Sequence, residues 1–204
     1  MATRTEARPP SALSERRRQE LVLAAYREIA EHGFEGLRTR EVAAEVGVNI
    51  ATLHYYFPTK ESLIRGVLDH AMGRFRSTLA PHGSPGDQLR NHLRAVRKLL
   101  LEEPELGAVM AELALRASRD ADIGAIVDGT FDAWTTTTRG LLRRAVKAGA
   151  MRPELDSAPV AALIVAALSS LTLPPMADTR GDDALRQLER WLGIGGVRKS
   201  ASSK

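Results

Sequence analysis

Residues 39–63 read TREVAAEVGVNIATLHYYFPTKESL, which contains two short helical patterns joined by a turn. Gly47 permits a left-handed turn, and Asn49 is a residue type that favours the position just before a helix. On the second helix Leu53 and Phe57 lie four residues apart, so both are expected to face the core. The segment is therefore predicted to form a helix-turn-helix.

The opposite face of the second helix carries Ile50, Ala51, His54 and Tyr55. Such a face suits a recognition helix whose N-terminal half contacts base edges and whose tyrosines contact phosphates. A helical hairpin with a few exposed aromatics would give the same pattern. The geometry of the segment supports both interpretations about equally.

Helical periodicity also covers the rest of the chain. A first helix is expected from Ser14 to about His32, with Gly33 at its C-terminal end. Thr39 is expected to cap the first helix of the pair, and Thr59 a longer helix that ends at Pro81. Further helices are predicted over 87–102, 104–118, 120–148, from about Asp156 to Pro174, and over 182–192.

The fold class is therefore predicted as all-α, with about nine helices, because no alternating strand pattern appears and aromatics make up only 4% of the chain. A three-helix domain with the helix-turn-helix, the candidate DNA-binding domain, would precede a larger helical domain. The expected division is a disordered arm at 1–13, the helix-turn-helix domain at 14–62, the second domain at 63–194 and a flexible tail at 195–204. The helix from 59 links the domains, and a Pro- and Gly-rich linker follows at 81–86.

Composition excludes several classes of chemistry. The chain has no cysteine, so disulfides, thiolate nucleophiles and Cys-ligated zinc are ruled out. Its five histidines show no HExxH spacing, and no metal site or cofactor is expected. No secretory signal is seen, and the longest apolar run, 158–173, is about one turn short of a membrane span. A cytoplasmic protein without a membrane partner is expected.

The net charge of +4 is a weak indication of nucleic-acid binding because of its distribution. Residues 1–18 hold five Arg and two Glu, and 198–204 hold three basic residues and no acid. The remaining residues, 19–197, carry 21 basic and 23 acidic side chains. The positive excess therefore belongs to the two ends of the chain.

Residues from about 15 to 65 resemble the TetR family of one-component regulators. The matching positions are Gly33-Phe34, Thr39, Val42-Ala43, Gly47-Val48, Thr52-Leu53, Tyr56-Phe57, Lys60-Glu61 and Leu63. Beyond them the chain resembles the family in length, helix count and the segment 148–156. The resemblance implies a homodimer that binds a double-stranded DNA operator and responds to a small-molecule effector.

Carried over residue by residue, the resemblance implies a set of DNA contacts. Arg40 would reach a base or a phosphate, Ile50 and Ala51 would touch base edges, and His54 stands where the family most often has tyrosine. With only apolar contacts from Ile50 and Ala51, specificity is expected to lean on Arg40, His54 and DNA shape. The expected DNA-binding residues are Thr39, Arg40, Asn49, Ile50, Ala51, Thr52, His54, Tyr55, Tyr56 and Lys60, of which Thr52, Tyr55, Tyr56 and Lys60 would bind the backbone.

The effector pocket is predicted among the helices of 87–102, 104–118 and 120–148. Its expected wall residues are Met110, Leu113, Val127, Phe131 and Trp134, which favour a mainly hydrophobic ligand. Arg97 and Arg116 are the nearest candidates to bind an anionic group. A filled core without any ligand is the alternative.

The dimer interface is predicted on the helices of 159–173 and 182–192, because the first is apolar nearly all round. Its expected residues are Leu163, Ala167, Leu168, Leu171, Leu188 and Trp191.

Three functions remain open from the sequence. The first is a dimeric repressor that binds a palindromic operator and is released by a small hydrophobic molecule. The second is a constitutive or co-repressor-dependent DNA-binding protein. The third is an all-helical enzyme that carries a helix-turn-helix, but it would need clustered titratable groups, and no catalytic residue is apparent.

Overall fold

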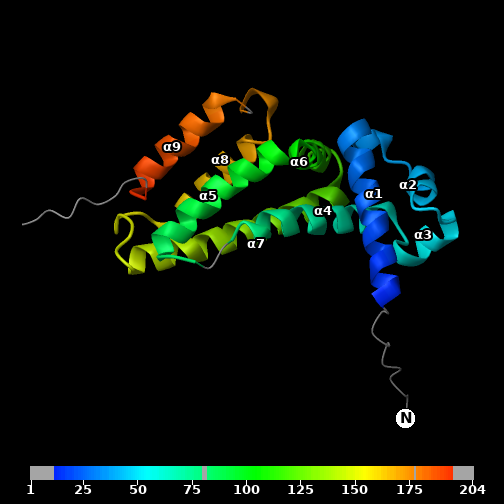
Figure 1. The fold of residues 1–204 in the computed structure, drawn as a ribbon, viewed down its shortest axis with the longest axis horizontal. Coiled ribbons are helices and arrows are strands. Elements are labelled where there is room, and N and C mark those ends of the chain that lie inside the picture. Colours follow the sequence, from blue (N-terminus) through cyan, green and yellow to red (C-terminus); the bar gives the residue numbers. More distant parts are fainter. Residues whose placement is uncertain (1–11, 80–81, 177, 195–204) are drawn as a thin grey trace, which may run out of the picture. The chain divides into compact units, whose positions relative to one another are not determined.

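The computed structural model describes residues 12–79, 82–176 and 178–194. These residues form α-helices and one short 3-10 helix, with no strand among them, so the predicted all-α class is confirmed (Figure 1). The chain divides into two compact units between Val67 and Leu68. Of the predicted arm and tail, all but residues 12 and 13 lie outside the described part, and these two begin the first helix.

The N-terminal unit consists of α1 (Ala12–Gly36), α2 (Thr39–Glu45), α3 (Ile50–Tyr56) and the start of α4 (Lys60–Ser77). The backbone of α1 leaves the helical conformation at Gly33, whose φ is 71°, where the sequence predicted the end of the helix. Gly47 has a φ of 70° in the turn between α2 and α3. The residues buried most deeply in this unit are Leu21, Val22, Ala25, Ile29, Val42, Leu53, Phe57, Leu63 and Ile64.

Two contacts hold the helix-turn-helix on α1, and a third brings α4 close to α1. Arg27 pairs with Glu45 at the end of α2, and the Arg17 guanidinium donates a hydrogen bond to the Val46 carbonyl at 3.2 Å. The third is a close approach at Gly66 on α4, where a Cβ would lie 2.9 Å from a methyl group of Val22. Only glycine lets α4 pass α1 at this distance.

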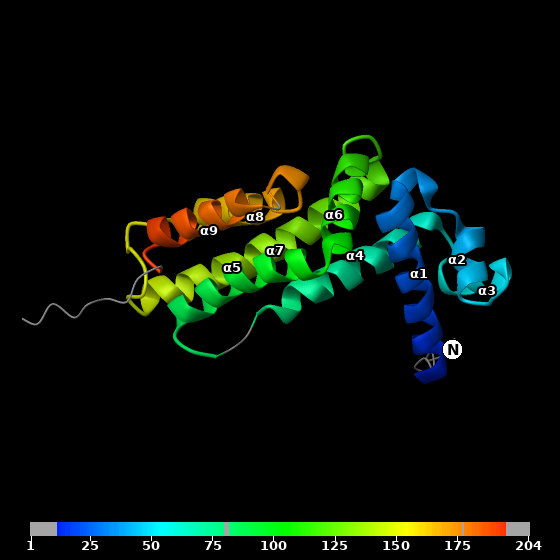
Figure 2. The same cartoon turned by 45° about the horizontal axis from the view of Figure 1, so that its top comes forward.

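The C-terminal unit holds the rest of α4, then α5 (Pro85–Glu102), α6 (Pro104–Ala117), α7 (Ala121–Lys147), α8 (Ser157–Ser170), a 3-10 turn η1 (Pro174–Met176) and α9 (Thr179–Leu192). The long helix α7 packs against α5, α6 and α8, and α9 lies along α5 (Figure 2). The deepest core residues are Leu89, Leu93, Val96, Leu106, Val109, Leu113, Ala145, Ala161, Ile164 and Leu168. Of the helices described, none combines the length and hydrophobicity needed to cross a bilayer.

Helix caps explain where the predicted boundaries shift. Thr39 is the first residue of α2 rather than its cap, and Arg38 holds the cap position without a side-chain hydrogen bond. α5 begins at Pro85, two residues before the predicted start, because Ser84 and Asp87 form a capping box. α9 begins three residues early because the Asp178 carboxylate accepts the backbone N–H of Arg180 at 2.9 Å.

Candidate nucleic-acid interface and internal cavity

The exposed face of α3 is built on a helix whose start and buried side are both fixed. Asn49 accepts the backbone N–H of Thr52 at 2.8 Å and the Thr52 hydroxyl at 3.0 Å, which confirms the predicted cap. Leu53 and Phe57 are each 1% exposed and hold the opposite side in the core. Tyr55 is consequently turned outward and is 79% exposed.

A shallow open hollow of about 510 Å³ lies beside this face, at the starts of α2 and α4. It brings together four predicted residues from three helices: Thr39 and Arg40 from α2, His54 from α3 and Lys60 from α4. Arg38, which the sequence analysis did not select, lines the same hollow. A basic residue directly before the helix-turn-helix was the available signal.

The other predicted DNA-binding residues take different positions. Ile50 and Ala51 are exposed at the start of α3, and the Tyr56 ring meets the Tyr55 ring edge-on, with centroids 5.1 Å apart. Asn49 and Thr52 are engaged in the helix cap. The Lys60 ammonium lies 4.5 Å from the centre of the Phe34 ring, a cation–π contact that holds it at the start of α4.

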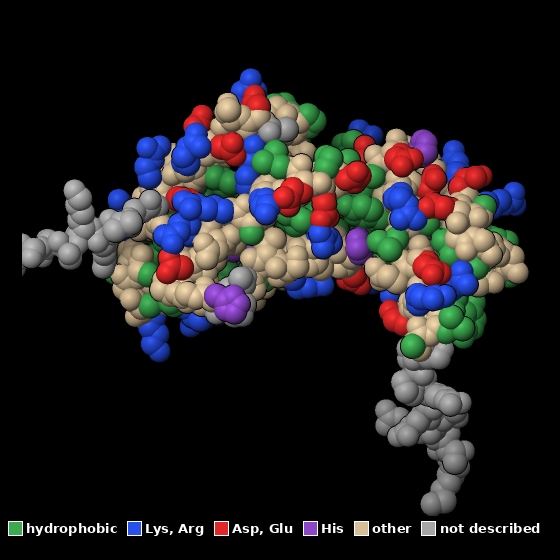
Figure 3. Space-filling model, viewed as in Figure 1, with side chains coloured by type: hydrophobic (Ala, Val, Ile, Leu, Met, Phe, Trp, Pro, Cys, Tyr) green, Lys and Arg blue, Asp and Glu red, His purple; other side chains and the backbone are tan. Residues whose placement is uncertain are grey.

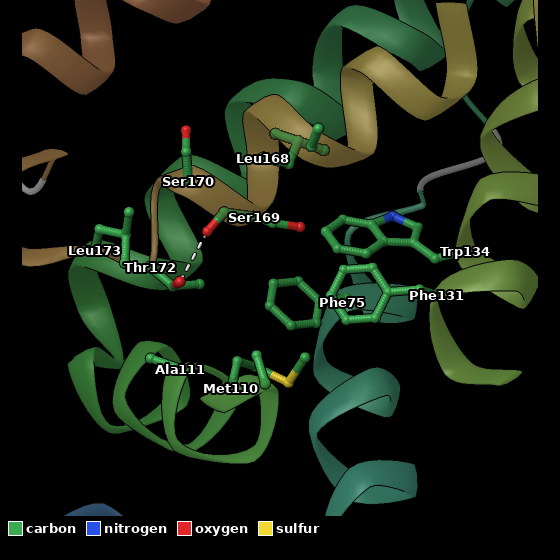
Figure 4. A pocket seen from close by; sticks show the side chains of 12 residues that line it. Phe75, Met110, Ala111, Phe131, Trp134, Leu168, Ser169, Ser170, Thr172 and Leu173 are labelled. Atoms are coloured by element: carbon green, nitrogen blue, oxygen red, sulfur yellow. Dashed lines mark hydrogen bonds between the residues drawn. The ribbon is translucent and has the colours of Figure 1, made fainter. Parts of the chain in front are cut away.

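The C-terminal unit contains a partly open cavity of about 330 Å³ (Figure 4). Its walls come from α4, α6, α7 and α8 and the residues that follow α8. The rings of Phe75 and Trp134 stack there with centroids 5.2 Å apart and planes tilted by 23°. The lining residues are Phe75, Met110, Ala111, Ala114, Phe131, Trp134, Ala166, Leu168, Ser169, Ser170, Thr172 and Leu173.

Three of the five predicted wall residues line this cavity: Met110, Phe131 and Trp134. Leu113 and Val127 do not; they are 0% and 7% exposed and belong to the core. The sequence analysis did not select Phe75 of α4 or any of the residues that α8 contributes. Periodicity shows which face of a helix is buried but not where neighbouring helices stay apart.

Polar groups around the cavity are engaged with the protein itself. The hydroxyl groups of Ser169, Ser170 and Thr172 donate to backbone carbonyls of their own segment at 2.7–2.8 Å. The cavity therefore offers a largely apolar surface in which these hydroxyls retain only acceptor capacity.

The two arginines considered for an anionic group have structural roles instead. Arg97 is 6% exposed and donates to the Asp182 carboxylate at 2.8 Å and to the carbonyls of Met176 and Asp178 at 3.2 and 2.8 Å. Arg116 donates to Asp120 at 3.0 Å, next to the N-terminal end of α7. Neither side chain lines the cavity, so the prediction that they bind an anionic group there is wrong. Arg97 instead joins α5 to α9, and Arg116 bridges the turn between α6 and α7.

Two family models cover most of the chain. Residues 21–67 match the model described as bacterial regulatory proteins, tetR family, and residues 79–188 match that of the tetracyclin repressor-like, C-terminal domain. The chain belongs to the TetR family. The exposed face of α3 and the cavity are therefore features of a TetR-family transcriptional regulator.

Individual relatives are distant. The chain is 32% identical over 106 residues to the HTH-type transcriptional dual regulator CecR of Shigella flexneri. This alignment covers 52% of this chain and 43% of CecR. It is 28% identical over 108 residues to the nucleoid occlusion factor SlmA of Pasteurella multocida, covering 51% of this chain and 54% of SlmA. The chain thus spans about half the length of these curated relatives.

The fold itself is shared along nearly the whole length. A TetR-family structure from Rhodococcus sp. superposes with a TM-score of 0.78 at 23% identity and covers 87% of this chain and 99% of its own. At this identity the likeness concerns the fold alone.

Homodimerisation and ligand binding are typical of TetR-family proteins, and the predicted interface residues divide into two groups in this chain. Leu163 is 51% exposed and Trp191 37%, while Ala167 and Leu188 are half-buried. Leu168 and Leu171 are 0% and 4% exposed, because they pack inside the protomer, and are not available to a partner. Leu168 and Leu171 are therefore removed from the predicted interface, and the other four residues remain a prediction.

Proposed function

We propose that this TetR-family protein is a dimeric, effector-responsive repressor that binds a palindromic operator and leaves it when a small, mainly hydrophobic molecule binds. The observation that carries the proposal is the exposed face of α3, where Ile50, Ala51, His54 and Tyr55 stand outward while Leu53 and Phe57 are buried. A large aromatic ring exposed on a short capped helix gains nothing from the protein's own core, whereas it suits contact with DNA.

The surrounding charges support contact with the phosphate backbone. Arg38, Arg40 and Lys60 surround the hollow next to α3, although Glu41 also lines it. On the face of the C-terminal unit shown in Figure 3, acidic and basic side chains are interspersed. DNA contact is therefore assigned to the hollow and the exposed face of α3.

The test is a titration of the full chain with DNA from the region upstream of its own gene, at several salt concentrations. Tyr55→Ala and Lys60→Ala are expected to weaken binding, and each lost phosphate contact should lower the slope of log affinity against log salt by about one. Lys98→Ala is the matched control because Lys98 is exposed at 72% on α5. Binding unchanged in both variants at moderate salt would refute the assignment of α3.

The effector response rests on the cavity of about 330 Å³ and its Phe75–Trp134 stack. A panel of apolar compounds is expected to change Trp134 fluorescence and to release the DNA, with Trp191→Phe removing the signal of the second tryptophan. If no compound alters Trp134 emission or releases DNA, the constitutive interpretation replaces the effector-responsive one.

A further inference from the structure

Three buried side-chain atoms in the described part of the chain have no hydrogen-bond partner: His92 Nε2, Trp134 Nε1 and Thr138 Oγ1. All three belong to α5 and α7, which pack against each other. Their side chains are 1%, 6% and 0% exposed. A buried polar atom without a partner is costly, so a ligand group that formed hydrogen bonds with two of these atoms at once would bind favourably.

Two of the three residues share a second, smaller cavity. This space of about 50 Å³ is lined by His92 from α5 and Trp134 from α7, together with the side chains Met72, Phe75, Arg76, Leu79, Ala133 and Thr137. Phe75 and Trp134 line both this cavity and the larger one, so the two cavities adjoin each other at these stacked rings. In Figure 4 the indole nitrogen of Trp134 lies on the edge of the ring that faces away from Met110.

The hydrogen bonds of His92 define what its free nitrogen can do. Thr78 donates its hydroxyl proton to the Phe75 carbonyl at 2.6 Å, so it can only accept from His92 Nδ1, which lies 2.7 Å away. The proton of the neutral imidazole therefore sits on Nδ1, and Nε2 is an acceptor. Burial lowers the pKa of His92 to about 4, which keeps the ring neutral.

We propose that the small cavity binds the polar end of the effector, and that this end is a hydroxyl group. Trp134 Nε1–H would donate to the hydroxyl oxygen, and His92 Nε2 would accept the hydroxyl proton. The apolar body of the same molecule occupies the larger cavity. This inference rests on the effector response proposed above and specifies its ligand class as an apolar molecule with one neutral hydroxyl.

A carboxylate fits this pair of atoms less well. Its oxygens only accept, and the lone pair of His92 Nε2 would repel one of them. Arg76 also lines the small cavity but is an exposed side chain, whose charge is screened by solvent. A hydroxyl is the simplest uncharged group that donates and accepts at the same atom.

Three flat aromatic probes separate the possibilities: 2-naphthol, 2-methylnaphthalene and 2-naphthoate. The first two differ only by a hydroxyl in place of a methyl group. Binding is followed in two-dimensional ¹H–¹⁵N NMR spectra of the full chain, whose two tryptophans give two indole N–H signals. Trp191→Phe assigns the Trp134 signal, and the Trp191 signal serves as an internal reference.

We expect 2-naphthol to bind about three- to tenfold more tightly than 2-methylnaphthalene, the range that one or two neutral hydrogen bonds provide. Only 2-naphthol should move the Trp134 indole proton downfield, as hydrogen bonding does. His92→Phe removes the acceptor and keeps a ring of similar size, so it should reduce the affinity for 2-naphthol to that for 2-methylnaphthalene. His92→Gln, which retains an acceptor, should restore part of the difference, and thermal unfolding of both variants verifies that they fold.

Equal affinities for the two neutral probes, or tighter binding of 2-naphthoate, would overturn the hydroxyl assignment while leaving an apolar effector site in place. Binding of none of the three at millimolar concentration also overturns the inference. Because the NMR readout contains no DNA, all of these outcomes are distinct from a failure of operator binding.

Discussion

Asn49 shows how one side chain positions the exposed face of α3. Its carboxamide oxygen accepts two hydrogen bonds from Thr52, one from the backbone and one from the hydroxyl. The side chain thereby sets the first turn of α3 and, with it, the direction in which Tyr55 points. We assign Asn49 to the framework of the proposed DNA contact.

Replacing Asn49 by Ala is expected to destabilise the protein by about 1 kcal/mol, the usual effect of losing a helix cap. The free energy of unfolding in urea measures it. Asn91→Ala is the matched control, because Asn91 is exposed inside α5, where Ala is a better helix former. An Asn49→Ala protein as stable as the control would show that the cap does not hold α3.

His92 makes stability depend on pH. Because burial holds its folded-state pKa at about 4 against an ordinary 6.5, only the unfolded chain takes up a proton between these values. The stabilising effect is therefore complete above pH 6.5 and is lost as the pH falls toward 4. His70 acts in the same direction, because burial, and then Arg74, lower its pKa too.

We expect the contribution of His92 to the free energy of unfolding to fall by about 2 kcal/mol when the pH is lowered from 7 to 5. Urea unfolding at both pH values measures the free energy of unfolding. The loss of stability between pH 7 and pH 5 should be about 2 kcal/mol smaller in His92→Phe than in the unmodified protein. The carboxylates of Asp87, Glu103 and Asp120, whose pKa values lie below their ordinary range, contribute only at lower pH. Identical pH profiles of the two proteins would contradict the buried, neutral state of His92.

At the level of elements, Arg97 fastens the end of the chain to α5. It binds both η1, through the Met176 carbonyl, and the start of α9, through Asp182 and the Asp178 carbonyl. A second pair, Arg94 with Glu189, joins the same two helices at 2.6 Å, and the glutamate is only 5% exposed. α9 is thus held by charges at both ends of its contact with α5.

Arg97→Met is expected to lower the free energy of unfolding by about 2 kcal/mol, because it removes the hydrogen bonds that the buried guanidinium makes to η1 and the start of α9. It should also expose α9 to limited proteolysis. Arg186→Met, which breaks the exposed pair with Asp183 on α9 itself, should change stability by less than about 0.5 kcal/mol. Equal effects of the two variants would show that Arg97 does not anchor α9.

The ends of the helices could be predicted from the sequence where a recognisable capping or turn residue marks them. Gly33 and Gly47 indicated turns because few other residues adopt a positive φ. Asn49 indicated a helix start because its side chain can accept a backbone N–H there. Asp178 was overlooked because six residues of α9, 179–184, precede Leu185, where the apolar stripe of the helix begins. The exposed face of α3 followed from four-residue spacing alone.

The cavity was only half predictable for a physical reason. Met110, Phe131 and Trp134 lie on inward stripes that periodicity identifies, whereas Phe75 became a wall only because α4 and α7 stack their rings. The partners of Arg97 lie 79 or more residues away along the chain, and Thr78, the partner of His92, lies 14 residues away. Such partners are set by tertiary packing, which no local pattern records.

On the scale of the whole molecule, the outward residues of α8 and α9 predict self-association. Leu163→Glu is expected to produce folded monomers, because a charge at a side chain exposed by 51% disturbs only a partner. Leu101→Glu is the control at nearly the same exposure, 52%, on α5. Sedimentation equilibrium at micromolar concentration measures both, and a Leu163→Glu protein that remains dimeric would refute the α8 interface.

The larger cavity has walls drawn from residues as far apart as Phe75 and Leu173, so it exists only once α4, α6, α7 and α8 have all packed. A molecule that occupies it binds the folded chain and not the unfolded one. At a hundred times its dissociation constant it would reduce the unfolded population by about a hundredfold, which corresponds to about 2.7 kcal/mol. In a cell, where proteases remove unfolded chains, an effector of this protein would therefore also prolong its lifetime and raise its abundance.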